Sequence, residues 1–127
     1  MTENEIYQIN PITLAFVGDA EFSLYVRRTL TVGHDYKAAE LTRRANRAVS
    51  AVAQSKMFEA IEKTLTERET EIARRARNAH TPSHAKNAAL SEYKRATALE
   101  AVFGYLSLLG DRDRLDGLME QCLRVDG

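Results

Sequence analysis

The chain has 127 residues, 44% hydrophobic and 28% charged, with no net charge, which is enough to form one domain with a buried core. A single cysteine, Cys122, excludes an internal disulfide, and no apolar run approaches the ~18 residues of a membrane-spanning helix. No signal-peptide pattern opens the chain. We therefore expect one domain over residues 1–127, located in the cytoplasm and making no contact with membranes.

The neutral total hides an uneven distribution of charge along the chain. Residues 42–95 contain twelve lysines and arginines against six acidic residues, whereas the remainder contains six against twelve. This pattern permits a basic face, suited to a polyanion such as nucleic acid, on a neutral protein. Ordinary solvated helix surfaces explain the same charges equally well, so charge alone leaves both interpretations open.

Helical spacing of the apolar residues, with only two prolines in the chain, predicts an all-α domain. The first helix begins at Pro11, after a cap at Asn10, and runs to about Thr31, stopping near Gly33. A second helix is expected over residues 37–47.

Two further helix starts carry capping signals. Ser50 can cap a third helix, which extends to about Thr64. Thr66 and Glu69 have the spacing of a capping box and start a fourth helix, which continues to about Ala79.

The clearest internal loop is HTPSHAKN at residues 80–87, because it combines Pro, Ser and Asn. A long helix follows, beginning at Ala88 or Ser91 and ending at Leu109, and the glycine after Leu109 takes the C-cap position. A last helix, capped by an aspartate, is expected over residues 111–125. The domain therefore contains about six helices.

Two acidic residues lie in segments that otherwise resemble buried helix. Asp19 interrupts the apolar run AFVGDAEFSLYV at residues 15–26, and Glu100 lies in TALEAVFGYLSLLG, whose apolar residues surround most of the helix. An unpaired buried charge costs on the order of several kcal/mol, so each acid needs a partner. Gly18 adjoins Asp19 and Gly104 follows Glu100 by one turn, and glycine lets another backbone approach closely. If the helices cross at these glycines, the carboxylates face each other across a cleft.

Two carboxylates held close together repel each other, so the arrangement is tolerable only if one is protonated or a cation lies between them. Carboxylate oxygens suit Mg²⁺ or Mn²⁺, which keep several waters and need only one or two protein carboxylates beside substrate phosphate. Two plainer explanations stay open at this point. Asp19 can cap a shorter helix from Ala20, and Glu100 can be a rim residue paired with Arg95 or Lys94.

Four segments in a single order along the chain carry a family resemblance. They are LAFVGDAEFSLYVRR at 14–28, RRANRAVSAVAQ at 43–54, RRARNAHTPSHAKN at 74–87 and YKRATALEAVFGYLSLLG at 93–110. Together they resemble the ribonuclease III family, and most closely its compact mini-ribonuclease III subclass, which has no separate double-stranded-RNA-binding domain. The resemblance implies a homodimer of helical ribonuclease III-type endonuclease domains that cleaves both strands of duplex RNA with Mg²⁺, for which Mn²⁺ can substitute.

The resemblance also assigns roles to the two acids. Asp19 matches the aspartate of the first family signature and Glu100 the glutamate of the second, so both are expected to be catalytic and metal-binding residues. Ordinary members have two further acids at the positions of Ala15 and Thr97, and their loss is typical of the mini subclass. With fewer carboxylates, the ion should be more hydrated and held more weakly until substrate phosphate binds. The Thr97 hydroxyl can orient a metal-bound water, or belong to an ordinary surface threonine.

Basic and amide residues around the 80–87 loop are the expected RNA contacts, because duplex RNA presents a regular surface of phosphates and 2′-hydroxyls. They are Arg74, Arg77, Asn78, Lys86 and Asn87, with Lys94 and Arg95 near the start of the helix that carries Glu100. Any one of them can instead be solvated surface charge. The resemblance further implies the substrate, which is the precursor of large-subunit (23S-type) ribosomal RNA, cut at paired stems.

Two other functions stay open. The same helices can bind structured RNA as a non-catalytic dimer if Ala15 and Thr97 mark lost activity, although retention of Asp19 and Glu100 argues against this. A dimeric helical interaction domain without a nucleic acid partner explains the helices but not the basic block. His80 and His84 have no further ligand pair at zinc spacing, and no Ser-His or Cys-His pairing is evident. Metal-assisted hydrolysis is therefore favoured over covalent or histidine-based catalysis.

Overall fold

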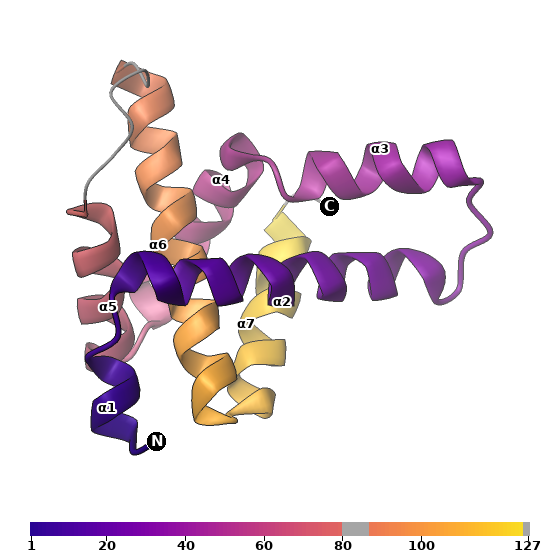
Figure 1. Ribbon diagram of the computed structural model, residues 1–127. Helices are drawn as coiled ribbons and strands as arrows, with labels where there is room; N and C mark the ends of the chain where they lie inside the picture. Colours follow the sequence, from indigo (N-terminus) through magenta and orange to yellow (C-terminus); the bar gives the residue numbers. More distant parts are fainter. Residues whose placement is uncertain (80–86, 126–127) are drawn as a thin grey trace.

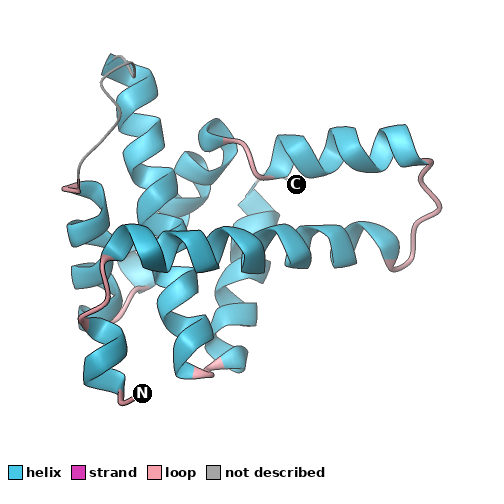
Figure 2. Ribbon diagram, in the orientation of Figure 1, coloured by secondary structure: helices cyan, strands magenta, loops and turns pink. Residues whose placement is uncertain are grey.

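The structure is a computed structural model that describes residues 1–79 and 87–125 (Figure 1). This part of the chain contains seven α-helices, one short 3₁₀ helix and no strand (Figure 2), which confirms the predicted all-α class. None of the described helices is long and apolar enough to span a membrane. The elements are α1 (Glu3–Tyr7), α2 (Pro11–Thr31), α3 (Ala38–Ala48), α4 (Ala51–Ile61), the 3₁₀ helix η1 (Glu62–Thr64), α5 (Glu67–Arg77), α6 (Asn87–Leu109) and α7 (Arg112–Val125).

Helix α6 forms the centre of the fold. It contacts α1, α2, α4, α5 and α7, and α2 crosses it near its middle (Figure 1). Every residue from 98 to 103 except Glu100 is buried, as expected for a helix with apolar residues around most of its circumference. Helix α3 turns back along the C-terminal half of α2 (Figure 1). The acid in the middle of α6 is therefore surrounded by core residues.

Helices α2 and α6 touch backbone to backbone at two glycines. A Cβ atom placed on Gly18 would lie 1.7 Å from the carbonyl oxygen of Glu100, and one placed on Gly104 would lie 1.8 Å from the carbonyl oxygen of Leu14. No side chain fits in either space, so only glycine permits this approach. The crossing predicted from the two glycines is confirmed, and it brings the segments around Asp19 and Glu100 together.

Helix ends follow the predicted capping residues. Asn10 caps α2, and Thr66 with Glu69 forms the complete capping box that starts α5. Gly33 and Gly110 adopt positive φ angles of 77° and 79°, the conformation in which glycine ends a helix. These signals are local, and the predicted ends of the helices accordingly lie close to the observed ones.

Helix α1 is one helix more than the sequence predicts. Its signal is present in the chain, because Thr2 and Glu5 form a reciprocal capping box and Ile6 is buried. The third predicted helix ends in the 3₁₀ turn η1 rather than continuing as α-helix. The predicted loop at 80–87 lies outside the described residues, except that Asn87 begins α6.

Candidate active site

Asp19 and Glu100 meet where α2 crosses α6. Asp19 is exposed on α2, and Glu100 is half-buried on α6. Burial, hydrogen bonding with Asp19 and the negative charge of Asp19 together raise the pKa of Glu100 to about 8, against the lowering effect of the Gln54 amide. The two carboxylates are thus close enough to disfavour ionisation of both at once.

The structure removes the plainer explanation of Asp19, and for Glu100 it removes pairing with Arg95. Helix α2 runs without interruption from residue 11 to residue 31, so Asp19 does not cap a helix. Glu100 accepts a hydrogen bond from Nε2 of Gln54 at 3.4 Å, whereas Arg95 forms an ion pair with Glu59 at 3.2 Å. Glu100 therefore lies inside the crossing and is not the partner of Arg95 at the rim.

The paired carboxylates form a donor set that suits a hard divalent cation such as Mg²⁺. Because its pKa is raised, the Glu100 carboxyl keeps its proton when no cation is bound. A bound cation would displace that proton. Among residues 1–79 and 87–125, no group of three or more His, Cys, Asp or Glu residues is placed to hold a metal. Ala15 and Thr97, where the family resemblance leads one to expect acids, are both buried one turn from the pair. Water and substrate oxygens would supply the remaining ligands.

Thr97 lies one turn before Glu100 and is only 8% exposed, so it is not an ordinary surface threonine. Its hydroxyl donates a hydrogen bond to the carbonyl oxygen of Tyr93 at 2.9 Å. The hydroxyl proton is therefore engaged, and the oxygen keeps only its capacity to accept. A role for Thr97 in orienting a metal-bound water stays a prediction, limited to accepting a hydrogen bond.

The predicted RNA contacts on α5 lie at its C-terminal end. Arg74 pairs with Glu71, and Arg77 lies 3.5 Å from Glu62, in both cases on exposed surface. Exposed pairs of this kind contribute little to stability, so these arginines can exchange a carboxylate for a phosphate at small cost. Asn78 is the exposed C-cap of α5. Of the other predicted contacts, Lys86 lies outside the described residues, as does the side chain of Asn87.

On α6, the two predicted RNA contacts differ in their surroundings. Lys94 is half-buried near the start of the helix. Arg95 donates hydrogen bonds at 2.7 Å to the hydroxyls of both Ser55 and Ser91, in addition to its ion pair with Glu59. Its guanidinium thus fastens α4 to α6, and a contact with RNA stays a prediction for this residue.

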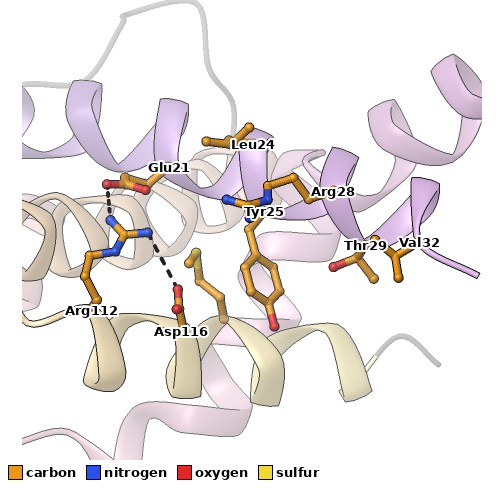
Figure 3. A pocket seen from close by; sticks show the side chains of 9 residues that line it. Glu21, Leu24, Tyr25, Arg28, Thr29, Val32, Arg112 and Asp116 are labelled. Carbon is orange, nitrogen blue, oxygen red and sulfur yellow. Dashed lines mark hydrogen bonds and ion pairs between the residues drawn. The ribbon is translucent and has the colours of Figure 1, made fainter.

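A separate groove lies between the C-terminal half of α2 and α7 (Figure 3). Glu21 accepts hydrogen bonds from Arg112 at 2.6 Å and from Ser107 at 2.5 Å, and Arg112 also lies 3.7 Å from Asp116. The Arg112 hydrogen bond lowers the pKa of Glu21, the opposite of the effect at Glu100. The charged groups of this groove are therefore paired with one another, and they link α2 to α7. The candidate active site is the crossing of α2 and α6.

Cys122 is the single thiol of the chain and is fully buried on α7. Burial raises the pKa of this thiol to about 12. A protonated, enclosed thiol is a poor nucleophile, so Cys122 serves packing, in keeping with the preference for metal-assisted hydrolysis.

Comparison with known proteins identifies the class. The ribonuclease III domain family model matches residues 12–111, and the chain belongs to this family of endoribonucleases. Its relatives include the mini-ribonuclease 3 of Streptococcus pneumoniae, 40% identical over 97% of this chain and 98% of the relative. The mini-ribonuclease 3 of Brevibacillus brevis is 41% identical over 91% of this chain and 87% of the relative. These relatives confirm the resemblance to the mini subclass.

A solved structure supports the same conclusion for the fold. A crystal structure of a Fusobacterium nucleatum protein superposes with a TM-score of 0.80 at 30% sequence identity, and the match covers 94% of this chain and 96% of that one. The all-α arrangement described above is therefore shared over nearly the whole length of both chains.

Proposed function

We propose that the protein is a Mg²⁺-dependent endoribonuclease that cleaves double-stranded RNA, with Mn²⁺ able to replace Mg²⁺. The observation that carries the proposal is the meeting of Asp19 and Glu100 at the glycine crossing, in a chain of the ribonuclease III family. Relatives named mini-ribonuclease 3 support it over most of their length.

Asp19 and Glu100 would hold the cation and thereby place it against the scissile phosphate. When bound, Mg²⁺ supplies a Lewis acid that activates a water and offsets the charge developing on the phosphate. Glu100 would release its proton to solvent on binding the cation, and its half-burial restricts the direction of its carboxylate. Asp19 is exposed and so lies where a duplex can reach it.

The proposed RNA surface surrounds the end of α5 and the start of α6. It comprises Arg74, Arg77, Asn78, Lys86, Asn87, Lys94 and Arg95. Contacts of this type read the shape and charge of an A-form duplex more than its sequence. By family resemblance, we extend the proposal to maturation of 23S-type ribosomal RNA precursor in the cytoplasm.

A homodimer that pairs through α2 is part of the proposal. Phe16 is 79% exposed and Leu24 is 51% exposed, and Ala20 lies between them on the same side of the helix. Large apolar side chains exposed at this spacing indicate a contact surface. This surface adjoins Asp19, so a two-fold axis through the surface would bring the acid pairs of the two subunits near each other. Cleavage of both strands of a duplex requires two such sites.

Replacing Phe16 with glutamate should convert the dimer to monomer. A charge in a buried interface is expected to weaken dimerisation by about 100-fold or more, equivalent to about 2.7 kcal/mol. Analytical ultracentrifugation over a range of protein concentrations measures the effect. Val52→Glu, at a 48% exposed position on α4, is the matched control and should leave the dimer intact. A dimeric Phe16→Glu protein would show that the interface lies elsewhere.

Cleavage should depend on both the duplex and the metal. We expect labelled duplex RNA to be cut on both strands with Mg²⁺, and to stay intact with EDTA, since two carboxylates alone do not activate water. Single-stranded RNA of the same sequence should stay intact. Electrophoresis of the end-labelled products measures both results. Cutting in EDTA would contradict the metal mechanism, and salt-sensitive binding without cutting would favour the non-catalytic RNA-binding function.

A further inference from the structure

Gln54 is a polar residue buried beside the acid pair. It lies on α4, is 2% exposed, and donates a hydrogen bond from Nε2 to Oε2 of Glu100 at 3.4 Å. Burying an amide without hydrogen bonds carries a free-energy cost, so an apolar residue would fill this core position more favourably. The hydrogen bond to Glu100 is therefore the reason we infer for a glutamine at this buried position.

An uncharged donor suits this position better than a charged side chain would. It donates a hydrogen bond without adding charge, whereas a third carboxylate would increase the repulsion between Asp19 and Glu100. A lysine or arginine would occupy the place of the cation with its own charge. The amide hydrogen of Gln54 already points to Oε2 of Glu100, so the donor is in place on one side of the carboxylate.

Helix α4 holds Gln54 firmly against α6. The next residue, Ser55, is also 2% exposed and accepts a hydrogen bond from Nε of Arg95 at 2.7 Å. Two successive buried polar residues of α4 therefore each hold a polar residue of α6, Gln54 holding Glu100 and Ser55 holding Arg95. The two contacts share no residue, so each can be changed without removing the other.

We propose that Gln54 is a positioning residue, which orients the Glu100 carboxylate for binding a divalent cation. The inference rests on the proposed function, because the cation is the one bound by Asp19 and Glu100. A hydrogen bond to Oε2 restricts rotation of the carboxylate before the ion arrives, so less side-chain freedom is lost when it binds.

Gln54→Met tests this role, because methionine keeps the size and burial of glutamine but cannot donate. The dissociation constant for Mn²⁺ of the RNA-free protein should rise about 10-fold to 100-fold, measured by the electron paramagnetic resonance of free Mn²⁺. The metal concentration for half-maximal cleavage should rise in parallel, and cleavage should recover at saturating metal. If Gln54→Met does not fold, Gln54→Asn gives the same test, since its shorter amide cannot reach Glu100.

Ser55→Ala is the matched control, because it removes a buried hydrogen bond from the same helix without touching Glu100. Its Mn²⁺ dissociation constant should equal that of the wild type. Wild-type Mn²⁺ affinity in a folded Gln54 variant would overturn the inference. Asp19→Asn separates this outcome from failure of the proposed function. If Asp19→Asn loses Mn²⁺ binding and the Gln54 variant does not, the role of Gln54 is rejected. If neither variant changes Mn²⁺ binding, the metal site itself is rejected.

Discussion

Asp19→Asn and Glu100→Gln are each expected to abolish cleavage of duplex RNA, with a loss on the order of 10³-fold or more in the single-turnover rate at saturating Mg²⁺. Each substitution keeps the shape of the side chain but removes one of the two carboxylates that meet at the crossing of α2 and α6. A site with two carboxylates has no spare ligand, so the loss should exceed that of an enzyme with four.

The control for this prediction is Asp113→Asn, an isosteric change at an exposed position on α7. It should cleave at the wild-type rate. Binding of duplex RNA by the Asp19 and Glu100 variants, measured in EDTA, should match the wild type, because phosphate contacts supply most of the affinity. Normal cleavage by both variants would show that the acid pair is not the active site.

The same variants should change the pH dependence of stability in metal-free protein. The pKa of Glu100 rises from 4.5 to about 8 on folding, so between these values the folded state binds a proton that the unfolded state releases. Stability of the wild type should therefore fall as the pH rises from about 5 to 8. Glu100→Gln should lack the decrease in stability that Glu100 causes. Asp19→Asn should keep part of that decrease, because Glu100 stays buried in this variant. Urea unfolding in EDTA at both pH values measures the difference.

Gly18→Ala and Gly104→Ala are expected to destabilise the fold by about 3 kcal/mol or more each, or to prevent folding. The added methyl groups would lie 1.7 Å and 1.8 Å from backbone carbonyl oxygens, which cannot move without separating α2 from α6. The effect runs against helix propensity, which favours alanine by about 0.5–1 kcal/mol. Urea unfolding followed by circular dichroism measures the loss.

Gly117→Ala is the matched control, since a Cβ atom at this exposed position on α7 meets nothing within 4 Å. It should stabilise the protein by about 0.5–1 kcal/mol through helix propensity alone. If Gly18→Ala were as stable as the wild type, the close backbone contact would not exist in solution, and the meeting of the two acids would need another explanation.

The amino-acid sequence by itself determined the helices, because their signals are local. Caps such as Asn10 and the Thr66 capping box, and glycines such as Gly110, act over a few residues whatever the rest of the chain does. Helix α1 was missed because five residues are too few for apolar spacing to show. Asp19 and Glu100 were also singled out from sequence, as acids in apolar helices and by the family resemblance, and their catalytic role stays a prediction.

Only the tertiary structure decided what surrounds these acids. It placed Gln54 against Glu100, 46 residues away in the chain, and paired Arg95 with Ser55 and Glu59. It also showed that Thr97 is buried with its hydroxyl proton engaged. Such contacts depend on the angle and rotation at which packed helices cross, which are set by the fit of whole surfaces and by the absence of two side chains at Gly18 and Gly104. No local pattern specifies that fit.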